Sequence, residues 1–150
     1  MRISFCGHAS FNGDSKYKKC LLDLLEELID GKDVEFYLGG YGSFDNFAYE
    51  CCREYKKNHT NAVLIFVTPY INESFERNHL SFAKRKYDAI IYPPLENVPP
   101  KFAITHRNRY MVDISDVIIS YISHSFGGAY QTYRYAQKKK KRIFNIYKKI

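Results

Sequence analysis

Short apolar segments alternate along this chain with stretches of helical periodicity, and this alternation limits the folds that it can adopt. The apolar segments are rich in Val, Ile, Phe and Tyr and contain few polar residues, which is typical of strands buried on both faces. They predict strands over residues 3–6, 34–38, 62–68, 89–92, 117–121 and 143–146. The stretches between them predict helices over residues 16–30, 43–57, 103–114 and 127–139, while residues 72–85 fit either a helix or a loop. Alternating strands and helices indicate an α/β fold with a mainly parallel sheet of about six strands flanked by helices.

The size and composition of the chain favour one soluble domain over residues 1–150. No apolar run approaches the roughly 18 residues of a membrane span, and the N-terminus lacks the apolar stretch of a signal peptide. We therefore expect a cytoplasmic protein with no membrane partner. Of the four cysteines, Cys51 and Cys52 are adjacent and none forms a CxxC pair, so we expect reduced packing residues and no metal site.

Small and polar residues follow several of the predicted strands. In a parallel α/β sheet, ligands bind beyond the carboxyl ends of the strands. The stretches GHASF, GGYGSFD and ISHSFGGA follow the first, second and fifth strands. They predict a ligand site that contains Gly7, His8, Gly39, Gly40, Gly42, Ser43, Asp45, Ser123, His124, Gly127, Gly128 and Ala129.

Two of these loops are rich in glycine and lead directly into a predicted helix. Glycine lets backbone N–H groups approach an anion, and the start of a helix adds unpaired N–H groups and a positive dipole end. GGYGS and FGGAYQT both have this form, although each also fits a tight strand-to-helix turn. Neither matches the P-loop or the GxGxxG dinucleotide pattern. We expect both loops to hold phosphate.

Side chains near the loops have more than one interpretation. Arg107, with Asn108 beside it, could bind a phosphate or carboxylate through two hydrogen bonds, or form a surface ion pair. Asp45 and Asp116 could bind a ribose hydroxyl or cap a helix, and capping is the simpler interpretation for Asp45. His8 and His124 lie on the predicted ligand loops, where a structural role is more common than a catalytic one.

The net charge of +7 is unevenly distributed. Five consecutive basic residues run from Lys138 to Arg142, and Lys148 and Lys149 follow. A solvated helix end explains such a run, since cations suit the helix dipole there, but the run could also attract an anionic partner.

The last predicted helix is rich in tyrosine. Tyr130, Tyr133 and Tyr135 precede the basic run. They offer a surface for self-association, so we expect a homo-oligomer, a dimer or larger.

Four stretches spread over almost the whole chain carry a family resemblance. They read ISFCGHASF, FYLGGYGSFD, RNRYMVDISDVIISYISHSFGGAYQTYRYA and KRIFNI. Together they resemble the SLOG superfamily, which includes DNA-processing protein A and the lonely-guy cytokinin-activating enzymes, and above all its small standalone members. The resemblance implies a Rossmann-like fold with a nucleotide-derived ligand at the glycine loops. Related domains in bacterial defence systems sense ADP-ribose-type signals.

Two positions depart from the pattern of the family. Where small SLOG proteins often read Gly-His-Arg, the chain has Gly7, His8 and Ala9, so one expected arginine contact is missing. The lonely-guy enzymes carry a glutamate in their second glycine motif, and the corresponding position here is Arg134. Their N-glycosidase chemistry needs a carboxylate to stabilise an oxocarbenium-like transition state, which an arginine cannot do.

These observations favour a binding protein for a nucleotide, a cyclic nucleotide or an ADP-ribose-like signalling molecule, acting as sensor or sequestering agent, without another cofactor. A nucleoside-monophosphate N-glycosidase is an alternative, with Asp45, Glu50 or Asp116 supplying the carboxylate. Single-stranded DNA binding is a second alternative, because single-strand binders combine basic and aromatic residues and this chain does so around Arg134.

Overall fold

A six-stranded sheet forms the centre of the computed structural model, which describes residues 1–69 and 81–147. The strand order is β4-β3-β2-β1-β5-β6, and every neighbouring pair is parallel. The strands are β1 (Arg2–Gly7), β2 (Val34–Leu38), β3 (Ala62–Val67), β4 (Ala89–Ile91), β5 (Val117–Tyr121) and β6 (Arg142–Asn145). The predicted α/β fold with a parallel sheet of six strands is confirmed, and each predicted boundary lies within one residue of the observed one.

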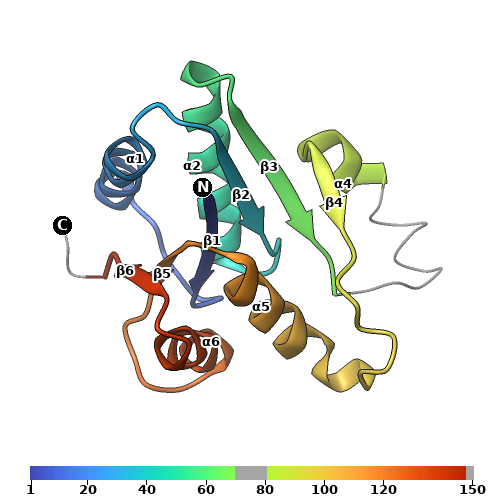
Figure 1. Cartoon of the computed structure of the whole chain (residues 1–150). Coiled ribbons are helices and arrows are strands. Elements are labelled where there is room, and N and C mark those ends of the chain that lie inside the picture. Colours follow the sequence, from blue (N-terminus) through green and yellow to red (C-terminus); the bar gives the residue numbers. More distant parts are fainter. Residues whose placement is uncertain (70–80, 148–150) are drawn as a thin grey trace.

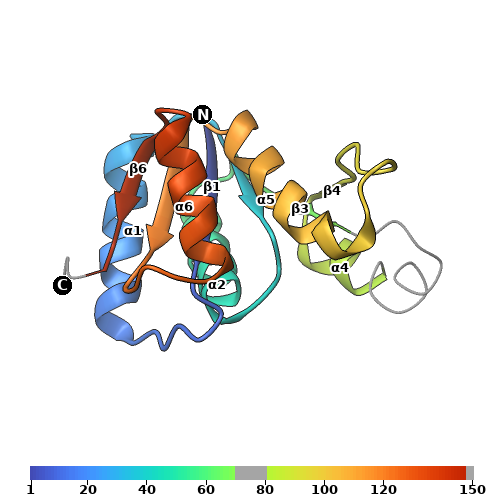
Figure 2. The ribbon, with the colours of Figure 1, turned by 90° about the horizontal axis from the view of Figure 1, so that it is seen from below.

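Helices cover both faces of this sheet. They are α1 (Ser15–Ile29), α2 (Ser43–Asn58), α4 (Ser81–Lys86), the 3-10 helix η2 (Pro100–Phe102), α5 (Ala103–Ile114) and α6 (Gly128–Lys138). The pair α1 and α2 lies on one face, and the pair α5 and α6 lies on the other (Figures 1 and 2). Of the segment 72–85, for which the sequence left helix and loop open, residues 72–80 lie outside the described residues.

Local signals in the sequence set the ends of α1. The Asp14 carboxylate caps its start by accepting hydrogen bonds from the backbone N–H groups of Lys16 (2.9 Å) and Tyr17 (3.2 Å). At the other end, Asp30 takes the left-handed conformation with a φ of 51°, and Gly31 follows with a φ of 73°. The helix therefore ends at Ile29, with Asp30 as its C-cap and a glycine directly after the cap.

The topology places a reversal of strand order beside β1. The chain moves outward from β1 to β4 and then returns through α5 to β5, which pairs with the opposite side of β1. At such a reversal the connections after neighbouring strands leave to opposite faces and open a crevice at the carboxyl edge. The loops after β1, β2 and β5 all reach this edge.

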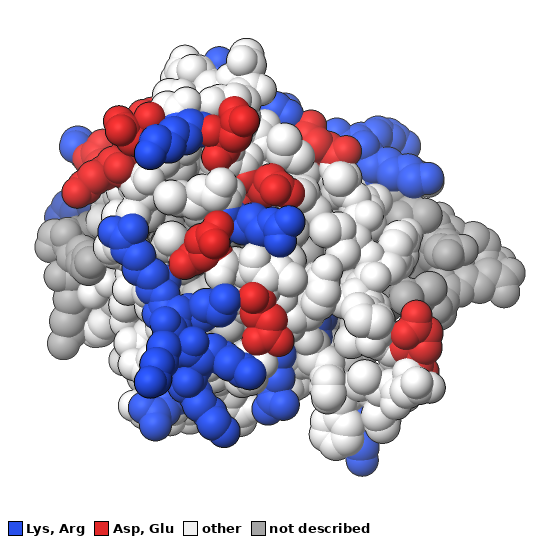
Figure 3. Space-filling view, in the orientation of Figure 1, with Lys and Arg blue, Asp and Glu red and all other residues white. Residues whose placement is uncertain are grey.

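The basic run lies at the other edge of the sheet. Arg142 is the first residue of β6 and pairs with Val117, the first residue of β5. Lys138 to Lys141 lead into Arg142, so the run stands at the amino edge, and Lys and Arg side chains gather over α6 and β6 in Figure 3. The run is thus separated from the glycine loops by the length of α6.

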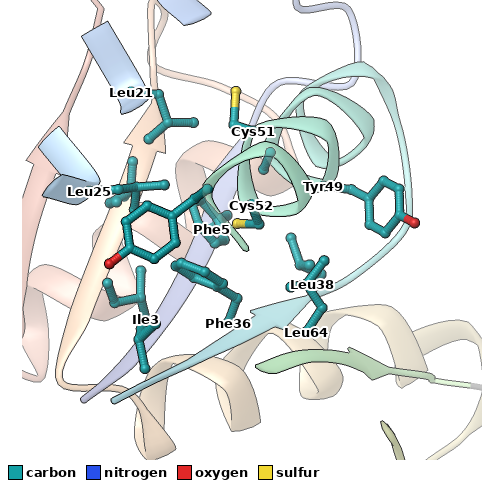
Figure 4. Close-up of a cluster of buried hydrophobic side chains, with 14 of the residues drawn as sticks. Ile3, Phe5, Leu21, Leu25, Phe36, Leu38, Tyr49, Cys51, Cys52 and Leu64 are labelled. Atoms are coloured by element: carbon teal, nitrogen blue, oxygen red, sulfur yellow. The ribbon is translucent and has the colours of Figure 1, made fainter. Parts of the chain in front are cut away.

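The largest hydrophobic cluster lies between the sheet and the α1–α2 pair (Figure 4). Strand residues Ile3 and Phe36 meet helix residues Leu21, Leu25 and Cys52, and all five side chains are fully buried. Each buried side chain of this size stabilises the fold by about 1.5–3 kcal/mol. The strands read as continuous apolar runs because helices cover both of their faces.

Candidate functional site

A cavity of about 350 Å³ opens at the carboxyl edge, between the ends of β1 and β2 and the helices α5 and α6. Many of the residues that the sequence predicted for a ligand site line it. These are Gly7, His8, Gly39, Asp45, Arg107, Asn108, His124, Gly127, Gly128 and Ala129. The predicted residues Gly40, Gly42, Ser43 and Ser123 are not part of the lining. The lining also includes Tyr41, Phe126 and Thr132, which the sequence did not single out.

The glycine loop after β2 is closed by contacts within the chain. The Asp45 carboxylate accepts the N–H of Tyr41 (2.9 Å), and the N–H of Ser43 donates to the carbonyl of Ala9 (3.1 Å). Gly42 has a φ of 94°, and a Cβ there would lie 2.9 Å from the Ala9 backbone. Conformation and packing therefore account for this glycine, as in the tight-turn interpretation.

The glycine loop before α6 is open by comparison. Gly127 has a φ of 89°, but a Cβ built on Gly127 or Gly128 would meet no atom of the described residues within 4 Å. No side chain caps α6, and its first backbone hydrogen bond runs from Gln131 N–H to Gly127 O (3.1 Å). The N–H groups of the first turn precede that bond and are available at the cavity wall. This loop keeps the features that suit an anion.

Aromatic rings stack along one wall of the cavity. The His8 and His124 rings are stacked with their centroids 3.6 Å apart, and the Phe126 ring lies 4.0 Å from that of His124. Phe126 is 70% exposed, and Tyr41, which also lines the cavity, is 61% exposed. Aromatic rings this exposed beside a cavity offer stacking surfaces for a planar ligand.

The His8 side chain is buried and fixed. Its Nε2 accepts the N–H of Ser123 (3.0 Å), so the ring proton of the neutral form is on Nδ1. Burial lowers the pKa of His8, and the neighbouring His124 lowers it further. The ring is therefore neutral at pH 7 and holds the loop after β5 against the end of β1.

Arg107 is buried in the floor of the cavity rather than exposed on the surface. Its Nη1 donates to the carbonyls of Gly39 and Val67, both at 2.8 Å, and its Nε donates to Asn108 Oδ1 (2.9 Å). The side chain is 2% exposed, so the interpretation as a surface ion pair is wrong. Arg107 joins α5 to the carboxyl ends of β2 and β3.

Asp45 carries the acidic charge of the cavity. Burial raises its pKa to about 6, although the hydrogen bond from Tyr41 and the charge of Arg107 act in the opposite direction. At pH 7 the group is ionised, and it accepts hydrogen bonds. It lies in the first turn of α2, where the sequence suggested a cap, and closes the preceding loop.

Other acidic residues considered from the sequence lie elsewhere. The Asp116 carboxylate accepts the N–H of Arg2 (2.8 Å) at the amino edge, so it neither caps a helix nor reaches the cavity. Glu50 is exposed on α2 and is not part of the lining. Among the residues that line the cavity, Asp45 supplies the carboxylate, and Arg134 stands outside on α6.

Three of the four cysteines are buried, and Cys20 is half-buried. They form no disulfide, and burial raises the pKa of the Cys6 and Cys51 thiols to about 12, which makes them poor nucleophiles. Within residues 1–69 and 81–147, no group of three or more His, Cys, Asp or Glu side chains could hold a metal ion. In the same residues, no helix has the length and apolar character needed to cross a membrane.

Two solved structures share the fold of this chain. One, DNA processing protein A from Helicobacter pylori, is described as having a unique single-stranded DNA binding mode; its TM-score is 0.62 at 21% identity, over 97% of this chain and 64% of that one. The other is DNA processing protein A (DprA) from Streptococcus pneumoniae, with a TM-score of 0.65 at 16% identity, over 96% of this chain and 49% of that one. No protein-family model and no curated protein sequence matches the chain.

These similarities establish a DprA-like fold, as the resemblance to the SLOG superfamily implied. The chain spans 64% and 49% of the length of the two structures, so it matches part of each.

Proposed function

We propose that this chain binds single-stranded DNA at the carboxyl edge of its sheet, with one nucleotide in the cavity. The observation that carries the proposal is that the open start of α6 and the exposed Phe126 ring line the same cavity. A nucleotide combines a phosphate with a planar base. The start of a helix binds phosphate, and an exposed aromatic ring stacks on a base.

The phosphate belongs at the start of α6. Gly127 and Gly128 leave open space around the backbone, and the first N–H groups of the helix lack a side-chain cap. The positive end of the helix dipole adds attraction for an anion. The loop after β2 is less suited, since Asp45 and Ala9 already accept its N–H groups.

The base belongs on the aromatic wall. One face of the Phe126 ring is near His124, and the ring is otherwise largely exposed. Stacking of a base on an aromatic side chain contributes about 1–3 kcal/mol to the free energy of binding, and any of the bases can stack in this way. Tyr41, from the loop after β2, also lines the cavity and offers a second ring.

Asp45 sets the orientation of the nucleotide. Its carboxylate repels a phosphate and accepts hydrogen bonds from amino or hydroxyl groups. Asn108 lines the same cavity and offers an amide. The phosphate therefore lies toward Gly128, and the polar edge of the base or the sugar lies toward Asp45.

One of the two structures with the same fold supports this choice of ligand. The structure from Helicobacter pylori is described by its single-stranded DNA binding mode. Extending that property to the present chain is part of our proposal, because the identity is 21%.

A free nucleotide or ADP-ribose-like molecule is the second candidate for the same cavity. The volume of about 350 Å³ favours it, since small-molecule sites range from about 300 to 1,000 Å³. Recognition of such a ligand would use the same phosphate and base positions and would not require further nucleotides.

Fluorescence anisotropy with labelled dT oligonucleotides, with AMP and ADP-ribose as competitors, tests both candidates. We expect Phe126→Ala to weaken oligonucleotide binding by about 5- to 100-fold, which corresponds to the loss of one stacked base. The matched control is Phe102→Ala, because Phe102 is 46% exposed on η2 and does not line the cavity.

Equal effects of the two variants would contradict the proposed placement of the base. If the displacement shows instead that a free nucleotide binds a hundredfold more tightly than the oligonucleotide, the second candidate is favoured. If neither DNA nor nucleotide binds at low salt, the proposed function is wrong.

A further inference from the structure

The last part of the chain is basic without any acidic side chain. From residue 117 to residue 150 the sequence contains no Asp or Glu, but it contains Arg134, Lys138, Lys139, Lys140, Lys141, Arg142, Lys148 and Lys149. Within the described residues, this segment builds β5, α6 and β6. The described Lys and Arg side chains gather over α6 and β6 on the surface that Figure 3 shows.

Within the described residues, the cations of this segment are not paired with carboxylates as those on the opposite face are. On α1 and α2, Lys18, Lys19 and Lys56 form ion pairs with Glu54, Asp23 and Asp88 at 2.7–2.8 Å. Within residues 1–69 and 81–147, no ion pair with a carboxylate involves Arg109, Arg134, Lys138, Lys139, Lys140 or Arg142. Unpaired cations on a single surface create a field that attracts anions.

A groove between α5 and α6 collects several of them. We call it the α6 groove; it has a volume of about 550 Å³ and is lined by Arg109, Gln131, Arg134, Tyr135, Gln137 and Lys138. Residues 131, 134, 135 and 138 are spaced by three and four positions, so they form one stripe along α6. The groove therefore follows the axis of the helix.

Tyr135 is held in place on the wall of this groove. Its hydroxyl donates to the Asp113 carboxylate (2.8 Å), and the Arg109 guanidinium lies 5.3 Å from the centre of its ring. Tyr135 is half-buried, whereas Arg109 and Arg134 are exposed. The Lys139 ammonium also lies 5.5 Å from the centre of the ring, and an aromatic ring with cations beside it is the combination that single-strand binders use.

The α6 groove begins where the cavity ends. Gln131 stands on the first turn of α6 and its N–H bonds to Gly127 O, while Gly127 and Gly128 line the cavity. Lys138 is the last residue of α6, and Lys139 and Lys140 continue toward the amino edge. Eleven helical residues extend about 16 Å, so the stripe connects the two edges of the sheet.

We propose that the α6 groove binds the sugar-phosphate backbone of a single strand whose first nucleotide occupies the cavity. This inference rests on the proposed function and adds the path of the strand, from Gly128 along Arg134 to the basic run. The groove lining contains no Leu, Ile, Val or Phe, so it lacks the apolar groups that membrane insertion requires. Exposed Arg and Gln donors suit phosphate oxygens.

Oligonucleotides of two lengths separate the groove from the cavity. Binding of labelled dT3 and dT20 is measured by anisotropy at several salt concentrations. The test variant is Arg134→Gln/Lys138→Gln, which removes two groove cations. The control is Lys32→Gln/Lys57→Gln, which removes two exposed cations on the α1–α2 side of the molecule.

We expect the groove variant to bind dT20 at least tenfold more weakly than wild type and to bind dT3 equally well. Loss of two phosphate contacts makes the slope of log K against log salt less steep by about 1.4 for a single strand. The control variant keeps the wild-type slope.

The inference is overturned if groove and control variants bind dT20 equally, or if wild type binds dT3 and dT20 with the same affinity per site. In that case dT3 binding that is lost in Phe126→Ala would still support the cavity. Absence of binding of both lengths by wild type would overturn the cavity and the groove together.

Discussion

Two glycines of this chain differ in what surrounds them. Packing within the fold requires one, while the other has open space and is proposed to serve ligand binding. A Cβ on Gly7 would lie 2.3 Å from the Phe44 ring, because the end of β1 packs directly against the start of α2. Gly128 is the first residue of α6, and a Cβ there would meet nothing within 4 Å. Packing thus explains the first glycine, whereas no contact within residues 1–69 and 81–147 explains the second.

This difference leads to opposite expectations for two alanine variants. Gly7→Ala overpacks a buried site and should destabilise the fold by about 1–3 kcal/mol, which lowers Tm by several degrees. Gly128→Ala should leave the free energy of unfolding within about 1 kcal/mol of wild type, since alanine suits a helix and has space here. We expect it nevertheless to weaken dT20 binding by about tenfold, because the new methyl group stands beside the N–H groups proposed to hold the phosphate.

Thermal unfolding and anisotropy on the same samples check this pair. A Gly128→Ala variant that is folded and binds as tightly as wild type would argue against a phosphate at the start of α6. A Gly7→Ala variant with an unchanged Tm would show that the contact with Phe44 is not tight in solution.

At the scale of elements, Arg107 connects a helix to two strands. It donates from α5 to the carbonyl of Gly39, which directly follows β2, and to the carbonyl of Val67, the last residue of β3. Strand ends are where backbone carbonyls lack sheet partners, so one guanidinium satisfies two of them and also lies near the Asp45 charge. The floor of the cavity therefore depends on a side chain that a ligand does not need to touch.

Arg107→Met keeps the length of the side chain and removes every donor. It leaves two buried carbonyls unsatisfied and Asp45 without its cation, so we expect a loss of about 3–5 kcal/mol in the free energy of unfolding. Urea denaturation measures it. The control is Arg109→Met, an exposed position on the same helix, which should change stability by about 0.5 kcal/mol or less. Similar losses in both variants would mean that the hydrogen bonds of Arg107 contribute little.

The elements themselves were predictable from the sequence, and the contacts between them were less so. Strands covered on both faces read as apolar runs, which is why β2 and β5 were predicted with their observed bounds. The site residues converge because the carboxyl ends of parallel strands meet at one edge. The burial of Arg107 depends on tertiary packing, and the exposed rings of Phe126 and Tyr41 carry no periodic signal, so the sequence did not single them out.

At the scale of the whole molecule, the two faces of the sheet differ in how much core they bury. The large cluster lies under α1 and α2, while the α5–α6 side holds two smaller clusters, one around Ile118 and Ala136 and one around Val67 and Met111. Thr132 and Ala136 are the buried residues of α6, whereas α1 buries Leu21, Leu25 and Ile29. Small side chains stabilise a helix less on burial, so α6 is attached to the sheet more weakly than α1.

This asymmetry predicts a distinct pattern of native-state hydrogen exchange. Amides of α6 and β6 should exchange through local opening, with a lower opening free energy than amides of β1, β2 and α1, which open with global unfolding. If the strand follows the α6 groove, dT20 binds the closed form of α6 and should raise the protection of its amides, since a ligand stabilises the state that it binds.

Exchange measured by mass spectrometry with and without dT20 tests this directly, and α1 serves as the internal control. Protection that rises in α6 as well as in α1 supports binding along the groove, because a strand held by the closed helix raises the free energy of local opening and of global unfolding. Protection that rises in α1 and stays unchanged in α6 would show stabilisation by ligand at the cavity alone, because local opening of α6 would then be independent of the bound strand. The weak attachment of α6 would in that case have no part in how the chain holds DNA.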